Sequence, residues 1–223
     1  MVSDMARTSG KERRGYGQYC AVAKALDVIG DRWTLLIVRE LLLRGGCRYT
    51  DLRAGLPGIA TNLLVARLRE LEDTGIVERE QAPPPVATTL FKLTPRGEGL
   101  RDVVHAIGRW GGALLREASP GDAFCSHWIA MPLELHLVDN APDRRPVTIE
   151  IRAGDQPATP VTIEASGTVR IRHGRAERPD AIVSGPPPAV LGLLTGKTTL
   201  AQARRHGVRF EGSAAALRRV QPR

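Results

Sequence analysis

The chain has 223 residues, a hydrophobic content of 42% and a formal net charge of +8, which is compatible with a globular protein of one or two modest domains. The first twenty residues lack the apolar segment of a secretory signal, and no apolar run is long enough to cross a membrane, so neither a signal peptide nor a membrane span is expected. The positive balance suits a polyanionic partner, but residues 1–118 and the remainder each carry +4, so charge does not locate the binding site.

The N-terminal part is expected to contain an arm followed by two helices. Residues 1–16 are small, charged and glycine-containing, which predicts a disordered arm. A helix is expected over 19–29 and ends at Gly30, and Asp31 is expected to cap a second helix over 32–44. The second helix is apolar on nearly every side, so we expect it to be buried on more than one side, against its own domain and, as one alternative, against a partner.

Residues 48–94 have the pattern of two helices joined by a turn and followed by a hairpin. Thr50 is placed to cap the first short helix, which Pro57-Gly58 stops. The second helix is expected over about 60–73, with leucines spaced four and three residues apart on one face, and Gly75 ends it.

Two alternating strands follow this helix, at 76–80 and 89–93, and a loop with three consecutive prolines joins them. This order of elements is the winged form of the helix-turn-helix, whose second helix enters the DNA major groove.

The outer face of the second helix carries short, polar and basic side chains, which suit contact with base edges and phosphates. With the neighbouring positions, the expected DNA-binding residues are Arg48, Thr50, Thr61, Asn62, Val65, Ala66, Arg67, Arg69, Arg79 and Lys92. An ordinary surface helix has a similar pattern, and Arg79 and Lys92 are as consistent with solvated charge as with phosphate contact. The combination of turn, helix and hairpin is what makes the pattern specific.

Thr94-Pro95 begins a further helix, with threonine as the cap and proline in the first turn. Its apolar side chains recur every three or four residues, at Leu100, Val103, Val104, Ile107, Trp110 and Leu114. We expect this stripe, together with Val22 and Leu26, to pack between two subunits; packing within one subunit is the alternative. A dimer places two recognition helices about one DNA turn apart, so the operator is expected to be near-palindromic.

Residues 116–123 mark a domain boundary, and short runs with strand periodicity, separated by turn residues, follow it. The periodicity predicts strands at 133–138, 147–152, 160–164, 168–173, 181–184 and 208–211, and helices at 186–195, 199–205 and 213–220. The expected fold class is therefore α+β, with a winged helix-turn-helix domain over 17–118 and a mixed α/β domain over 124–223.

The winged segment resembles the HxlR family of bacterial transcription regulators. The resemblance spans roughly residues 18–115 and lies in the runs Gly30-Asp31-Arg32-Trp33-Thr34, Arg48-Tyr49-Thr50-Asp51-Leu52, Leu56-Pro57-Gly58-Ile59, Arg67-Leu68-Arg69-Glu70-Leu71 and Leu93-Thr94-Pro95. It implies a homodimer held by the first and last helices of the domain, bound to an operator near a promoter that it represses or activates. In the wing, Leu90-Phe91 stands where the family has a charged and an aromatic residue.

The C-terminal part is similar to the sterol carrier protein type two-like fold. The similarity lies in the segments at 181–187, 191–196 and 208–213. It implies an apolar tunnel for a lipid-like or polyketide-like effector, and the residues expected to line it are Phe124, Trp128, Leu191 and Leu194. A packing module without a pocket is the alternative.

The remaining candidate sites concern cysteine and metal chemistry. Cys20 matches a cysteine that some members of the family use to sense oxidants or electrophiles, and its place near Lys24 and a helix amino end favours a lowered thiol pKa; an inert buried thiol is the alternative. Cys20, Cys47 and Cys125 have no paired spacing, which favours a reducing cytoplasm. Cys125 and His127, with His136 nearby, are too few ligands for a zinc site, so no metal and no cofactor are expected.

No constellation of catalytic residues is recognisable, so an enzyme is not expected. The leading hypothesis is a homodimeric, cytoplasmic DNA-binding transcription regulator, with double-stranded operator DNA as partner and a hydrophobic small molecule as a candidate effector. The alternative is a carrier of hydrophobic metabolites in which the winged domain serves mainly for dimerisation.

Overall fold

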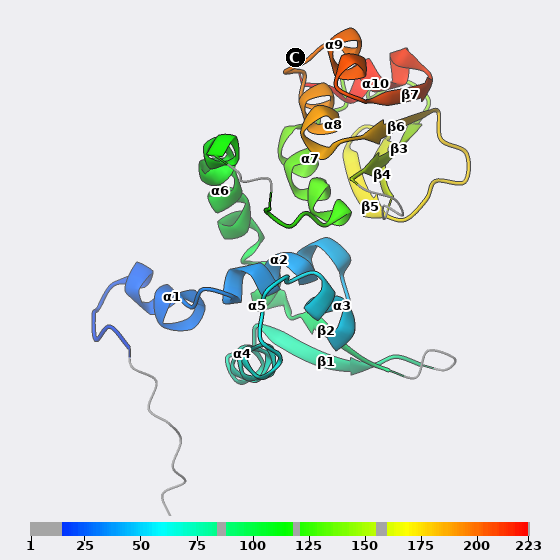
Figure 1. The fold of residues 1–223 in the computed structure, drawn as a ribbon. Helices are drawn as coiled ribbons and strands as arrows, with labels where there is room; N and C mark the ends of the chain where they lie inside the picture. The colour runs from blue at the N-terminus through cyan, green and yellow to red at the C-terminus, as the bar shows by residue number, and fades with distance from the viewer. Residues whose placement is uncertain (1–14, 84–87, 118–120, 155–159, 223) are drawn as a thin grey trace, which may run out of the picture.

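The computed structural model describes residues 15–83, 88–117, 121–154 and 160–222, which fold into two units packed against one another (Figure 1). The arm expected over 1–16 lies outside the described residues except for Gly15 and Tyr16, and so does the tip of the wing at 84–87. No helix of the described part is long and apolar enough to cross a membrane.

The N-terminal unit is a winged helix-turn-helix, as predicted. Its elements are α1 (Ala21–Ile29), α2 (Thr34–Arg44), α3 (Tyr49–Ala54), α4 (Thr61–Asp73), β1 (Val77–Gln81), β2 (Thr89–Leu93), α5 (Pro95–Glu98), α6 (Arg101–Gly111) and the 3-10 segment η1 (Gly112–Glu117). The strands β1 and β2 are antiparallel and extend from the body of the unit as a ribbon (Figure 1). Helix α2 lies at the centre, where Ile37, Val38 and Leu41 are fully buried.

Two predicted helix caps differ from the structure. Asp31 does not cap α2: Trp33 occupies the cap position, and the Asp31 carboxylate is drawn away by the charge of Arg67 on α4. Thr50 lies inside α3 instead of capping it; the Asp51 carboxylate satisfies the backbone N–H of Arg48 at the start of that helix, at 3.1 Å.

The helix predicted after Thr94-Pro95 begins as expected but is interrupted. The hydroxyl of Thr94 accepts a hydrogen bond from the Gly97 N–H at 3.1 Å, so the cap is confirmed. The helix then ends after Glu98 and resumes at Arg101 as α6, because glycines at 97 and 99 favour helix poorly. Leu100 therefore lies at the break, half-buried, and Val104 is buried within the unit.

The C-terminal unit is a mixed α/β structure around one five-stranded sheet. Its elements are η2 (Ser126–Ile129), α7 (Ala130–His136), β3 (Val147–Ala153), β4 (Val161–Ala165), β5 (Val169–His173), β6 (Ala181–Gly185), α8 (Pro187–Leu194), α9 (Leu200–Arg205), β7 (Arg209–Gly212) and α10 (Ala214–Val220). The strand order is β5-β4-β3-β6-β7, with β3 and β6 parallel and every other pair antiparallel.

Alternate residues of each strand point to opposite faces of the sheet, so one face is part of the core and the other is polar. Ile149 pairs with Ile163 on one side and with Ala181 on the other, and all three are buried on the same face. Helices α7, α8 and α10 pack against the sheet, whereas the β5–β6 connection crosses its polar face, where the Ala176 N–H donates to Glu150. The predicted strands from β3 to β7 and the predicted helices α8, α9 and α10 are confirmed within one or two residues.

The strand predicted at 133–138 is wrong, because residues 133–136 belong to helix α7, which ends at His136. Its alternating leucines also satisfy a helical spacing, in which Ala130, Leu133 and Leu137 share one buried side. Pro132 is tolerated because it lies in the first turn, where no N–H donor is needed. A short apolar run of this kind fits both periodicities, and the packing of α7 against α6 and β5 decided between them.

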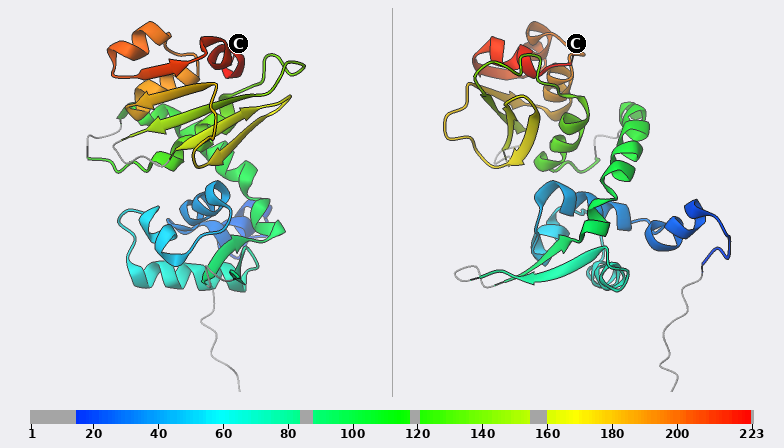
Figure 2. Two further views of the ribbon diagram at one scale, coloured as in Figure 1. Left: turned by 90° about the vertical axis from the view of Figure 1, so that its right-hand side faces the viewer. Right: turned by 180° about the vertical axis from the view of Figure 1, so that it is seen from behind.

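The two units share a packed interface. Helix α7 lies beside α6 and η2 lies over α2 (Figures 1 and 2), and buried apolar residues of both units belong to one continuous cluster. The second buried side of α2 accordingly faces the chain's own C-terminal unit, through Glu40 and Leu43.

Candidate nucleic-acid interface

The helix-turn-helix is held in shape by contacts on its inner side. Leu64, Leu68 and Leu71 bury one face of α4 in the core. The Tyr49 hydroxyl of α3 donates to the backbone carbonyl of Thr61 at the start of α4, at 3.1 Å. The turn between the helices contains Gly58 at φ 86°, a left-handed conformation that favours glycine. The outer face of α4 is thus presented on a rigid support.

The structure brings most of the predicted α4 contacts together on one outward face. Thr61, Asn62, Ala66 and Arg69 are exposed, and Val65 beside them is half-buried. Spacings of three, four and five residues place these side chains within about half of the helix circumference. Among the described residues Arg69 forms no ion pair, so its guanidinium is available to a phosphate or a guanine.

Arg67 lies elsewhere, although the sequence pattern grouped it with Arg69. Its guanidinium forms ion pairs with Asp31, which precedes α2, and with Glu70 on α4. Helical geometry turns this side of α4 away from the outward face. Arg67 therefore joins α4 to the segment before α2, and this pairing with Asp31 could not be inferred from the sequence.

The two basic residues predicted on the wing are also paired within the chain. Arg79 forms an ion pair with Glu72 of α4, and its guanidinium lies 5.3 Å from the centre of the Phe91 ring. Lys92 forms an ion pair with Glu80 on the neighbouring strand. Both cations are thus partly neutralised before any nucleic acid approaches.

The first helix of the motif adds a basic edge that the sequence reasoning only partly identified. Arg48 and Thr50 are exposed at the amino end of α3, as predicted. Arg53 is exposed too, and it shares the face of Thr50 because it follows three residues later. The predicted set omitted Arg53, although this helical spacing was a signal that could have found it.

Exposed apolar side chains lie on α1 and on α6, away from the outward face of α4. Val22, Leu26, Val103, Ile107, Trp110 and Leu114 are all exposed large hydrophobic side chains. Trp110 is 77% exposed and Ile107 is 48% exposed. The C-terminal unit covers the other side of α6, where Glu134 of α7 lies 3.3 Å from His105, and leaves this stripe open.

The three cysteines are free and lie in different environments. Cys20 is exposed at the start of α1, so the buried alternative does not apply to it, and hydrogen bonds from the backbone of Ala23 and Val22 lower the pKa of its thiol. Burial raises the pKa of Cys47 to about 12 and also raises the pKa of Cys125. Redox sensing by Cys20 stays a prediction.

The predicted effector-pocket residues lie in the C-terminal unit but serve different contacts. The rings of Phe124 and Trp128 meet edge to face at 6.3 Å, Leu194 is buried and Leu191 is half-buried. Trp128 donates its indole N–H to Glu40 of α2. The apolar pocket stays a prediction.

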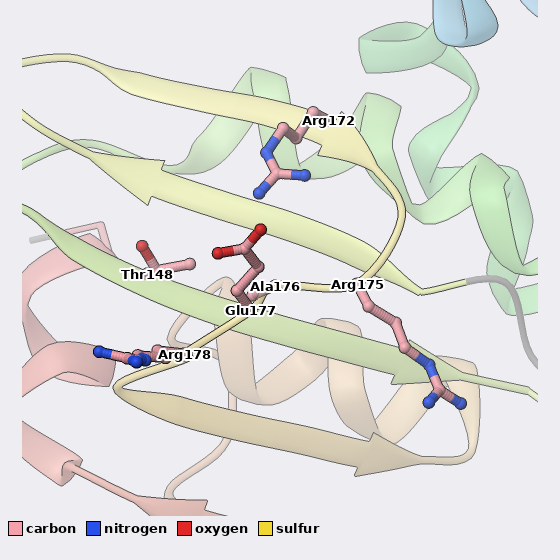
Figure 3. Close-up of a pocket in the computed structure, with 6 residues that line it drawn as sticks. All are labelled: Thr148, Arg172, Arg175, Ala176, Glu177 and Arg178. Carbon is pink, nitrogen blue, oxygen red and sulfur yellow. The ribbon is translucent and has the colours of Figure 1, made fainter.

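A hollow of about 650 Å³ lies instead on the polar face of the sheet, at the β5–β6 connection. Its lining residues are Thr148, Arg172, Arg175, Ala176, Glu177 and Arg178. Glu177 points toward Arg172, whereas Arg175 points away from the other side chains (Figure 3). In the part of the chain that the structure describes, no three His, Cys, Asp or Glu side chains are grouped to hold a metal ion.

Comparison with known proteins matches residues 28–119 to the HxlR-like helix-turn-helix family. YvaP of Bacillus subtilis strain 168, an uncharacterised HTH-type transcriptional regulator, is 36% identical over 87 residues, which are 39% of this chain and 80% of YvaP. YodB, an HTH-type transcriptional regulator of the same organism, is 32% identical over 101 residues, which are 45% of this chain and 87% of YodB.

Among solved structures, the reduced form of the transcriptional regulator YodB from B. subtilis aligns with a TM-score of 0.38 and 30% identity, covering 47% of this chain and 100% of that structure. Both curated relatives are named as HTH-type transcriptional regulators.

Proposed function

Because this chain belongs to the HxlR-like helix-turn-helix family, we propose that it is a DNA-binding transcription regulator that acts as a homodimer on a near-palindromic operator. The observation that carries the proposal is the outward face of α4, where short and polar side chains surround Arg69, which has no ion-pair partner among the described residues. Short side chains at the amino end let the helix approach base edges, and Arg69 supplies charge for a phosphate or a guanine.

The roles of the basic residues follow from their partners. Arg48, Arg53 and Arg69 are exposed and form no ion pair among the described residues, so we assign them to contact with the nucleic acid. Arg67, by contrast, holds α4 against the start of α2 through Asp31. The wing residues contribute less, because their ion pairs with glutamates must loosen before they reach a phosphate.

The open stripe on α1 and α6 supports the homodimer. Exposed large apolar side chains gathered on a helix in this way mark an interaction site. A second copy of the chain is the natural occupant, since a two-fold axis through the stripe pairs like surfaces and gives two recognition helices. The C-terminal unit leaves these side chains exposed, which supports a dimer that keeps both units.

The C-terminal unit is proposed to bind a hydrophobic small molecule that modulates operator affinity. Support comes from the similarity to sterol carrier proteins and from Phe124, an aromatic side chain 43% exposed beside Trp128. Such an effector must bind one dimer geometry better than the other in order to act. Thermal unfolding with a series of fatty acids tests this part, and an unchanged midpoint across the series speaks against it.

DNA binding is tested by fluorescence anisotropy with the DNA upstream of the gene and with random DNA, at a stated salt concentration. Arg69→Ala is expected to weaken binding by about 1–3 kcal/mol if it contacts a guanine, or to reduce the salt slope by about one if it contacts a phosphate. Arg204→Ala, an exposed arginine on α9, is the matched control and should leave affinity unchanged. Equal affinity of the wild type for both DNAs removes the proposal and leaves the metabolite-carrier hypothesis.

A further inference from the structure

A buried carboxylate lies at the centre of the interface between the two units. Glu40 of α2 is 0% exposed, and each of its oxygens accepts hydrogen bonds from both units. Oε1 accepts from Arg39 Nη2 at 2.8 Å and from the indole N–H of Trp128 at 2.7 Å. Oε2 lies 2.7 Å from Nε2 of His127 and 3.3 Å from Nε of Arg44.

Two of the four partners of Glu40, His127 and Trp128, come from the C-terminal unit. The Glu40 carboxylate can therefore be buried with all its partners only when this unit is docked. A buried charge is costly unless its hydrogen-bonding capacity is filled, and removal of one partner leaves the rest of the cost in place. Burial alone would raise the pKa of Glu40, but the hydrogen bond from His127, the charges of Arg39 and His127 and the hydrogen bond from Trp128 outweigh it and hold this pKa below its ordinary value. The carboxylate is therefore ionised and needs its partners from η2.

A second layer of contacts holds the same partners in place. The Arg39 guanidinium lies over the Trp128 ring, 4.3 Å from its centre. Arg44 Nη2 lies 3.1 Å from Nδ1 of His127. From β5, the His173 ring meets the His127 ring edge to face, with 6.0 Å between the ring centres. The C-terminal unit thus contacts one side of α2 through several side chains.

The same cluster touches the first helix of the helix-turn-helix at its carboxyl end. Gly55 follows α3 and lies so close to Glu40 that a Cβ atom there would be 1.9 Å from Oε2. Arg39 Nη2 also donates to the Gly55 carbonyl at 3.2 Å, and Sγ of Cys125 lies 3.8 Å from the Ala54 carbonyl. The position of α3 is therefore connected to the position of η2 through Glu40.

We propose that this cluster, formed by Arg39, Glu40 and Arg44 of α2 with His127 and Trp128 of η2, is a latch through which the C-terminal unit sets the position of α3. When η2 is docked, α3 is held for DNA recognition; when η2 withdraws, Glu40 loses two donors and the end of α3 loosens. The step from α3 to operator affinity rests on the proposed function, whereas the latch itself does not. Any displacement of η2 thereby changes how firmly α3 is held in the helix-turn-helix.

Hydrogen–deuterium exchange of the full chain tests the latch without DNA. Trp128→Phe keeps the aromatic ring but removes the donor to Glu40, and Trp128 belongs to the C-terminal unit. Loss of a hydrogen bond to a charged group is expected to speed amide exchange over residues 49–56 about tenfold. Phe124→Leu is the matched control, because Phe124 packs on Trp128 and makes no bond to Glu40, and it should leave this segment unchanged. Faster exchange confined to residues 124–130, or none, overturns the latch.

A second pair of variants guards against a simple loss of folding. Glu40→Gln keeps the shape and removes the charge, and Glu150→Gln removes another buried carboxylate, one paired with Arg152 inside the C-terminal unit. The latch predicts faster exchange at 49–56 for Glu40→Gln and not for Glu150→Gln; equal responses overturn it.

Operator affinity is measured last, with Trp128→Phe expected to shift it at least about threefold. An unchanged affinity overturns the coupling to DNA binding. If the wild type shows no operator preference, the proposed function fails while the exchange data still decide the latch.

Discussion

Trp110 offers the sharpest test of the proposed dimer. Its side chain is 77% exposed on α6, in line with Ile107, which is a costly arrangement for an indole in water unless a second copy covers it. In a two-fold dimer each Trp110→Ala substitution removes the same contact twice.

The magnitude follows from the exposed area. An aromatic side chain buries roughly 150–250 Å² when fully covered. About three quarters of that area, near 150 Å², is open on Trp110, and at about 25 cal/mol per Å² its burial contributes roughly 4 kcal/mol per subunit. Even if half of this is realised and alanine retains part of it, the dimer loses about 3 kcal/mol or more, so its dissociation constant rises at least about 100-fold.

Sedimentation equilibrium over a concentration series measures this change directly. Phe124→Ala is the control, since Phe124 is a partly exposed aromatic residue on the C-terminal unit, outside the stripe. Wild type and Phe124→Ala should dissociate in the same concentration range. A Trp110→Ala variant that dissociates in that range as well, or a wild type that stays monomeric at micromolar concentration, refutes the assignment of this surface.

Three further predictions concern stability. Gly55→Ala should lower the free energy of unfolding by about 1–3 kcal/mol in urea titrations, because the added methyl meets a Glu40 carboxylate that its donors prevent from moving; an unchanged midpoint means that Glu40 can swing away. Asp139→Asn breaks an ion pair with Arg219 whose side chains are 1% and 7% exposed, and should cost about 3–5 kcal/mol. Since the hydrogen bond from Arg219 holds the pKa of Asp139 well below its ordinary value, this contribution is present above about pH 4 and is lost as the pH falls further; equal acid sensitivity of wild type and variant contradicts it. Finally, burial raises the pKa of Cys47 to about 12, so the folded state keeps a proton that the unfolded thiol releases, and stability should fall by about 1.4 kcal/mol per pH unit from about pH 9 to 12. Cys47→Ala should flatten this alkaline slope, and an identical slope in both proteins would show that another group causes it.

Much of the winged unit was predictable because its signals are local. Thr94-Pro95 predicts a helix start, because the Thr94 hydroxyl caps the N–H of Gly97 three residues later. Gly58 and Gly75 indicate turns, because glycine readily adopts the left-handed backbone found there. The leucine spacing of α4 identifies its buried face without knowledge of what lies beneath it. The strands of the C-terminal sheet were predicted for the same reason, because apolar and polar side chains alternate with a period of two along a strand.

Side-chain roles that the sequence did not reveal depend on partners distant in the chain. Arg67 and Arg69 look alike in sequence, but only Arg67 has Asp31 beside it, 36 residues away. Glu40 lies within an apolar helix as an apparent exception, and its donor Trp128 is 88 residues further along. The segment at 133–138 fits two periodicities equally, and its packing against α6 and β5 selected the helix.

The sequence alone therefore predicted the helix starts, the turns, the strand faces and the helix-turn-helix itself. Each of these depends on dihedral preferences and on spacing within a few residues. The docking of the two units, the pairing of each charge and the surface left for a second copy emerged only on folding. The physical reason is that a buried charge is tolerated or costly according to the donors that surround it, and those donors are gathered by the packing of remote segments.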